Sequence, residues 1–290
     1  MFFKTIEELV NAAQERNLTI GQVVLEKQAK QLDKSPKEIF QKMTNQYQVM
    51  QEAAWKGINH PAKSFSGLVG HDGAKVMHRV KNGKSILGSL LGKAVARSLA
   101  VGEVNAAMGK IVAAPTAGSC GVLPACLISV EEEYAIPKEK VVEGLLTAAG
   151  IGLIIAKNAS ISGAEGGCQA ECGSASAMAA AAMVEILGGS PKQAAHATAI
   201  SLKNILGLVC DPVAGLVEVP CVKRNAMAAV NAITAAEMAL SGVESVIPVD
   251  EVVAAMLEVG EALPSSLKET AKGGLANTPT AKILEKRILK

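Results

Sequence analysis

The segment PKEKVVEGLLTAAGIGLIIAKNA, residues 137–159, constrains the fold more than any other part of the chain. After its first charged turns it is apolar on nearly every side, whereas a helix at a protein surface keeps one polar face. We therefore expect a central helix that other elements surround. Its longest apolar stretch, residues 144–156, is too short to span a bilayer, so we expect no membrane partner.

Helix-start signals recur along the chain. A Ser-Pro pair at residues 35–36, with an acid two positions later, is typical of a capping box and predicts a helix that ends near Gly57. The pair at residues 190–191 repeats this signal, with Gly207 as the expected end. Further helices are expected over residues 225–242 and from residue 250 onward.

Strand signals, in contrast, are nearly absent. The best alternating run is SVIPV at residues 245–249, and its proline disfavours a strand. Aromatic residues make up only 2% of the chain, so small aliphatic side chains must fill the core through many close helix contacts. We predict an all-α fold, a single globular helical domain over residues 1–290 with Gly-rich loops around its site.

Charge and the N-terminal segment exclude other classes of protein. The formal net charge is +2, from 29 basic and 27 acidic residues, which disfavours a nucleic-acid partner. The first residues carry acids and amides and lack a small-residue cleavage site, unlike a secretory signal. We expect a cytoplasmic protein.

Three glycine- and serine-rich segments interrupt the helices, over residues 64–75, 113–125 and 157–177. Loops between buried helices leave backbone polar groups that need partners. We interpret these loops as parts of a binding site.

Cys168, Cys210 and Cys221 share a pattern, since each lies beside a Gly or Pro break at the edge of a helix, with the spacing C-x41-C-x10-C. Thiolates on irregular backbone, near free amides, suit an iron–sulfur cluster. The alternative is that they are small buried apolar residues, and the spacing alone leaves both open. No C-x-x-C pair occurs, so a zinc ribbon or a thioredoxin-type site has no support.

The other cysteines have plainer interpretations. Cys172 lies four residues after Cys168, so a helix would place both on one face. We expect it in the core or beside a ligand. Cys120 and Cys126 suit small residues that line a loop and a helix.

Three long segments carry a family resemblance: EVNAAMGKIVAAPTAGSCGVLPA, NASISGAEGGCQAECGSASAMAAAAMVEILGG and LKNILGLVCDPVAGLVEVPCVKRNAMAAVNA. They closely resemble the α chain of iron–sulfur-dependent L-serine dehydratases, lyases that convert L-serine to pyruvate and ammonia without pyridoxal phosphate. The resemblance implies a helical catalytic domain and a 4Fe–4S cluster held by Cys168, Cys210 and Cys221. It also implies that Cys172 and Cys120, at positions where the family usually has Val and Ala, are not ligands.

The resemblance further implies a role in amino-acid catabolism and gluconeogenesis, and a partner. Three cysteines would leave one iron of the cluster open, to act as a Lewis acid on the substrate. Some family members carry an additional β domain, whose Ser-Ser-His motif approaches the site. Others have it as a separate chain, so the resemblance implies a β subunit on another polypeptide.

The segment PTAGSCG is the candidate binding loop for the substrate carboxylate. Thr116 and Ser119 offer hydroxyl groups, and Gly118 lets backbone amides approach an anion. The alternative is a tight turn between helices, and the resemblance favours substrate binding.

The catalytic base is not identified by the sequence. Asp72 and Lys75 match the family motif and are weak candidates, which could orient substrate or fix their loop. The family usually has Gly at His71, and His196 is expected to be structural.

Lys223 and Arg224 follow a predicted ligand. They either favour thiolates by their charge or form a solvated pair at a helix start. For the whole chain, three hypotheses compete: a lyase subunit, a cluster-binding module that is inactive without its β subunit, and a helical scaffold with redox-sensitive thiols.

Overall fold

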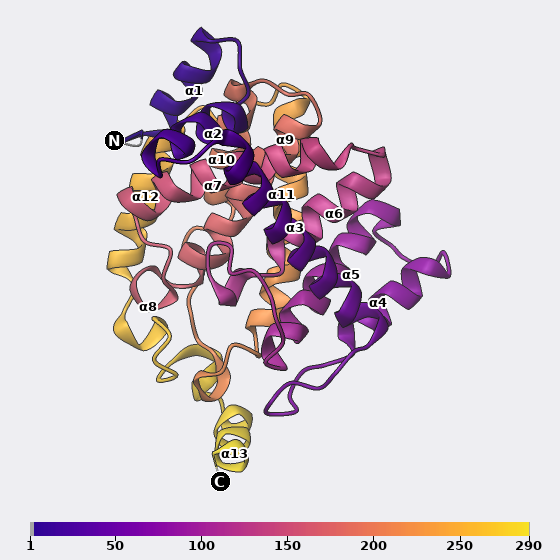
Figure 1. The fold of residues 1–290 in the computed structure, drawn as a ribbon. Helices are drawn as coiled ribbons and strands as arrows, with labels where there is room; N and C mark the ends of the chain where they lie inside the picture. Colours follow the sequence, from indigo (N-terminus) through magenta and orange to yellow (C-terminus); the bar gives the residue numbers. More distant parts are fainter. Residues whose placement is uncertain (1–2, 290) are drawn as a thin grey trace.

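The computed structural model describes residues 3–289 and confirms the all-α fold, because this part of the chain contains helices and no strand (Figure 1). The helices are α1 (Ile6–Glu15), α2 (Ile20–Gln31), α3 (Pro36–Asn59), α4 (Asp72–Lys81), α5 (Gly88–Ala106), α6 (Val122–Tyr134), α7 (Lys138–Asn158), α8 (Gly163–Gly166), α9 (Ser174–Ile186), α10 (Pro191–Lys203), α11 (Cys221–Leu240), α12 (Val249–Ala262) and α13 (Pro279–Ile288). Short 3₁₀ or π turns connect them: η1 (Ala117–Ser119), η2 (Gln169–Gly173), η3 (Val213–Gly215), η4 (Ser265–Leu267) and η5 (Gly274–Asn277).

Helices α7 and α9 form the centre of the molecule. They pack on each other, α2 covers α7, and α6, α10 and α11 cover α9. Small residues allow this close approach, because a Cβ at Gly144 of α7 would lie 2.5 Å from Ile186 Cγ2 of α9. The central helix predicted from residues 137–159 is thus confirmed.

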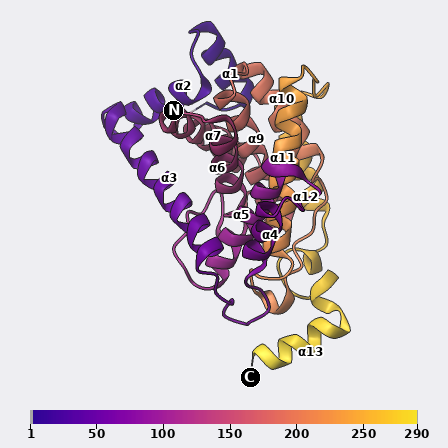
Figure 2. The same ribbon diagram turned by 90° about the vertical axis from the view of Figure 1, so that its right-hand side faces the viewer.

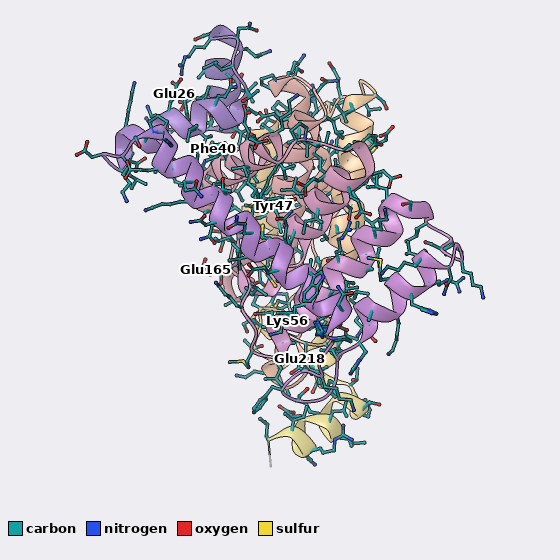
Figure 3. The ribbon with its side chains drawn as sticks, turned by 45° about the vertical axis from the view of Figure 1, so that its right-hand side comes forward. Glu26, Phe40, Tyr47, Lys56, Glu165 and Glu218 are labelled. Carbon is teal, nitrogen blue, oxygen red and sulfur yellow. The ribbon has the colours of Figure 1, made fainter. Side chains whose placement is uncertain are left out.

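Helix α3 runs along one side of the molecule and begins as predicted. The Ser35 hydroxyl accepts a hydrogen bond from the Glu38 amide at 3.3 Å. The Glu38 carboxylate accepts one from the Ser35 amide at 2.9 Å, which completes the capping box. Fully buried Tyr47 donates to Glu131 of α6 and so fixes α3 to the body (Figure 3).

The predicted end at Gly57 is wrong. The helix continues to Asn59, and a Cβ at Gly57 would lie 2.4 Å from the Ala100 carbonyl oxygen of α5. Here glycine permits close helix packing and does not stop the helix.

Two other predicted boundaries shift. Helix α10 ends at Lys203, and Gly207 follows in a turn with φ +82°. Helix α11 begins at Cys221, four residues before the predicted start at 225. This earlier start places the cysteine in the first helical turn.

The irregular segments gather at the end of the bundle from which α13 projects (Figures 1 and 2). There η2 contacts α8, α11 and η1, while α13 packs on η3 and η5. In residues 3–289, every helix is either too short or too polar to cross a membrane.

Candidate functional site

Cys168 lies at the junction of a sharp turn and a helix. Gly167 before it has φ +76°, and a Cβ there would lie 2.8 Å from the Leu208 carbonyl oxygen. The next amide, of Gln169, donates to that carbonyl at 2.9 Å. The left-handed turn therefore requires glycine and joins the Cys168 segment to the chain just before Cys210.

Cys210 lies in an extended stretch whose backbone pairs with the segment after α12. Its amide donates to the Leu267 carbonyl, and its carbonyl accepts from the Glu269 amide, both at 2.8 Å. Its side chain is buried. These two bonds hold the second predicted ligand from a distant part of the sequence.

Arg224 connects all three cysteine segments. It follows Cys221 by one helical turn, donates to the Val209 carbonyl at 2.7 Å and forms an ion pair with Asp211 Oδ1 at 2.8 Å. Its side chain is only 17% exposed. A hydrogen bond with Cys172 is the main cause that lowers the pKa of the Cys168 thiol, and the Arg224 guanidinium adds to this lowering, in keeping with the alternative that its charge favours thiolates. Lys223, by contrast, forms an ion pair with Asp72 at 2.8 Å.

The three thiols influence one another electrostatically. Burial, followed by the nearby Cys168, raises the pKa of Cys221 to about 12. Burial and Cys168 likewise raise the pKa of Cys210. Cys172, whose Sγ lies 3.5 Å from Cys168 Sγ, lowers the pKa of Cys168 through a hydrogen bond, against the effect of burial. Metal binding must displace protons from such thiols.

The candidate donors are thiols, the ligands that an iron–sulfur cluster takes. Within residues 3–289, no three His, Cys, Asp or Glu side chains come close enough to hold one metal ion. An iron–sulfur cluster is larger and takes cysteine thiolates as its ligands. The buried thiols of Cys168 and Cys210 and the half-buried thiol of Cys221 come from three separate segments, with the half-buried Arg224 beside them, and are ligands of this kind.

The other cysteines lie where the sequence suggested. Cys172 is fully buried beside Cys168, on the turn that leads into α9. Cys120 and Cys126 are buried in apolar clusters. Burial raises the pKa of Cys120 to about 12, so this thiol stays protonated.

The predicted substrate loop faces a carboxylate that sequence reasoning missed. Thr116 Oγ1 donates to Glu171 Oε1 at 2.7 Å, and Ser119 Oγ lies 3.2 Å from the same threonine oxygen. Burial raises the pKa of Glu171 above its ordinary value, although Thr116 opposes this. In the described chain, the Gly118 amide has no hydrogen-bond acceptor. The only sequence signal for Glu171 is that it is an isolated acid among small residues.

Asn225 fixes this loop to the cysteine helix. Its side chain donates to the carbonyls of Gly118, at 2.7 Å, and Cys221, at 2.9 Å, and accepts from the Gly121 amide at 2.9 Å. It is 2% exposed. Sequence reasoning missed this residue as well, because its partners in the substrate loop, Gly118 and Gly121, are more than a hundred residues away.

Asp72 and Lys75 lie beside the site but pair with each other. Asp72 binds Lys75 at 3.0 Å and Lys223 at 2.8 Å. Burial opposes but does not overcome the two lysines, which lower the pKa of Asp72. Buried Glu103 accepts from the Asp72 amide at 2.6 Å. These contacts favour the alternative that Asp72 fixes its loop.

Glu218 holds the loop at residues 64–75 against the start of α11. Glu218, buried three residues before Cys221, accepts 2.5 Å hydrogen bonds from the hydroxyls of Ser64 and Ser66. It lies toward the lower end of the molecule (Figure 3). The glycine-rich segment at residues 64–75 is thereby tied to the start of α11.

Of the histidines weighed from the sequence, His196 lies on α10 and His71 directly precedes Asp72 at the start of α4. His196 Nδ1 accepts from the Ser245 amide at 3.2 Å and helps to line a pocket beside α1 and α12. His71 has φ +68°, a left-handed conformation that glycine adopts freely. That backbone explains why glycine suits this position.

Comparisons with known proteins identify the family of the chain. The family described as "Serine dehydratase alpha chain" matches residues 15–276. The chain is 51% identical over 286 residues to the "Probable L-serine dehydratase, alpha chain" of Bacillus subtilis, covering 99% of this chain and 95% of that protein. It is 46% identical over 286 residues to the "L-serine dehydratase, alpha chain" of Peptoniphilus asaccharolyticus, covering 99% and 98%.

A longer relative aligns with most of the chain. The "L-serine dehydratase" of Streptomyces coelicolor is 40% identical over 277 residues, covering 94% of this chain and 60% of that protein. The family resemblance inferred from the sequence motifs, and with it the expectation of a lyase subunit, is confirmed. The chain belongs to the serine dehydratase alpha-chain family.

Proposed function

We propose that this chain is the cluster-carrying subunit of an L-serine dehydratase that forms pyruvate and ammonia, with a β subunit on a separate chain. The observation that carries the proposal is the meeting of Cys168, Cys210 and Cys221 around Arg224, next to the loop that holds Thr116. The names of the relatives support the substrate.

The three cysteines would hold a 4Fe–4S cluster as thiolates. Because each arises from a different segment, the site requires the folded chain. Arg224 would offset part of the negative charge that three thiolates bring. When bound, the cluster would supply an open iron as a Lewis acid toward the β-hydroxyl of serine.

The chain's own residues would bind and orient the substrate. The Gly118 amide would hold the carboxylate. Thr116, whose hydroxyl donates to Glu171, and fully buried Ser119 would support this loop, and Asn225 would keep it at a fixed position relative to Cys221. Loss of water from serine gives an aminoacrylate, which tautomerises and hydrolyses to pyruvate and ammonia.

We propose that the proton acceptor comes from the β subunit. The Lys75 and Lys223 contacts keep Asp72 ionised but weaken it as a base. The Streptomyces coelicolor relative extends well beyond the matched region, as expected if the longer protein includes the part supplied here by a second chain.

The test is a titration under argon of the reconstituted chain with its β chain, with serine-dependent pyruvate as the readout. We expect little activity from the chain alone, and an increase in kcat on addition of β that exceeds any decrease in KM. Full activity without β would contradict the proposed division of labour. No pyruvate from the complete complex would contradict the dehydratase function and favour a non-catalytic cluster-binding module.

A further inference from the structure

Glu171 is a half-buried carboxylate that forms no ion pair with another residue of the described chain. Thr116 donates to its Oε1, and no donor in residues 3–289 reaches its Oε2. The charged neighbour that acts on it is Glu269, another acid. Glu171 is half-buried and its Oε2 keeps access to solvent, so a ligand can reach this oxygen, and a partly desolvated carboxylate favours a cationic partner.

Two glycines close around this carboxylate. A Cβ at Gly118 would lie 2.7 Å from Glu171 Oε1, and a Cβ at Gly163 would lie 2.7 Å from Oε2. The same Cβ at Gly163 would lie 3.0 Å from Cys210 Sγ. Glu171 therefore occupies the space between the substrate loop and the thiols, and larger residues at either glycine would displace it.

Without a ligand, nearby negative charge destabilises the ionised carboxylate of Glu171. A Cβ at Gly163 would meet both Glu171 Oε2 and Cys210 Sγ, so a thiolate at Cys210 would lie close to the Glu171 carboxylate and repel it. The buried cation of the site, Arg224, is engaged with Asp211 and Val209. Within residues 3–289, no lysine, arginine or histidine forms an ion pair with Glu171, so its side of the site has room for a cationic ligand.

We propose that Glu171 Oε2 binds the α-ammonium group of the amino-acid substrate while Thr116 holds Oε1. This inference rests on the proposed function and identifies the group that selects amino acids over hydroxy acids. A serine zwitterion suits this pair of groups, because its carboxylate would bind the Gly118 amide and its ammonium would bind the Glu171 carboxylate. The ligand supplies the missing positive charge.

The test compares serine with L-glycerate, which has a hydroxyl in place of the ammonium. In the reconstituted complex, Glu171→Gln should raise the KM for serine about 10- to 100-fold, the value of a charge-assisted hydrogen bond. The Ki of L-glycerate should stay the same or fall, because the repelling carboxylate is gone. Glu171→Asp keeps the charge and should retain a preference for serine, with a weaker KM.

Controls separate this inference from cluster assembly and from the proposed function. Iron content and visible absorption should match wild type in both variants, and Glu165→Gln, at an exposed acid on nearby α8, should change neither constant. An equal loss of serine and glycerate binding, or no loss, in Glu171→Gln would overturn the ammonium site while wild type still makes pyruvate. A wild-type complex that neither binds nor converts serine would overturn the proposed function, and this inference with it.

Discussion

Replacing Arg224 by Gln should destabilise the chain because it leaves a buried carboxylate without its cation. Arg224 and Asp211 lie 2.8 Å apart, with side chains 17% and 4% exposed. Asp211 would keep only the Leu275 amide, at 2.7 Å on its other oxygen, as a partner. Breaking one side of such a buried pair costs about 3 kcal/mol. The Val209 carbonyl would also lose a charge-assisted donor.

The assay is denaturant unfolding of the cluster-free chain, kept reduced under argon. Arg224→Gln should lower the free energy of unfolding by about 3 kcal/mol. Asp211→Asn combined with Arg224→Gln should recover about 1 kcal/mol or more of this loss, because the double variant carries no unpaired charge. After reconstitution, Arg224→Gln should bind less iron than wild type.

Two results would refute this reasoning. One is a single-variant loss below about 0.5 kcal/mol, the size of an ordinary surface change. The other is strict additivity of the two substitutions together with full iron content. Either would mean that Arg224 does not connect the cysteine segments energetically.

Three further predictions follow from the same structure. Burial raises the pKa of Glu185 from 4.5 to about 7, so its protonated form stabilises the folded chain by about 3 kcal/mol. This contribution is fully present below pH 4.5 and is lost as the pH rises through about 7. The free energy of unfolding should therefore be lower at about pH 8 than at about pH 5, and Glu185→Gln should largely abolish this difference. Asn225→Ala should cost about 2 kcal/mol and raise the KM for serine, because the buried Gly121 amide loses its acceptor; unchanged stability and KM would contradict its positioning role. Air should inactivate the reconstituted complex, and ferrous iron with thiol should restore part of the activity; stable activity in air with a chelator would argue against the cluster.

The sequence predicted those features that depend on local physics. The capping boxes at Ser35 and Ser190 form as expected, because each involves residues within one helical turn. The apolar segment of α7 is central because hydrophobicity on all sides leaves no face for solvent. The boundary errors have a tertiary cause, since Gly57 serves the contact with α5 and not the end of its own helix.

The site was only partly predictable. The breaks around the cysteines marked the segments, but their meeting at Arg224 depends on contacts with residues 209 and 211 that no local pattern encodes. The sequence did not indicate Glu171 and Asn225 either, because their contacts are also distant in sequence. Their roles come from partners in the 116–121 loop, which lies 55 or more residues away in sequence.

The central claim is that Cys168, Cys210 and Cys221 hold the cluster while Cys172, 3.5 Å from Cys168, does not. The most direct measurement is anaerobic reconstitution with iron and sulfide, followed by visible absorption and iron content, for the Cys168→Ser, Cys210→Ser, Cys221→Ser and Cys172→Val variants. We predict that each of the three serine variants loses most of its iron and its absorption band, and that Cys172→Val keeps both. Loss of the cluster in Cys172→Val, or its retention in any of the serine variants, would contradict the assignment.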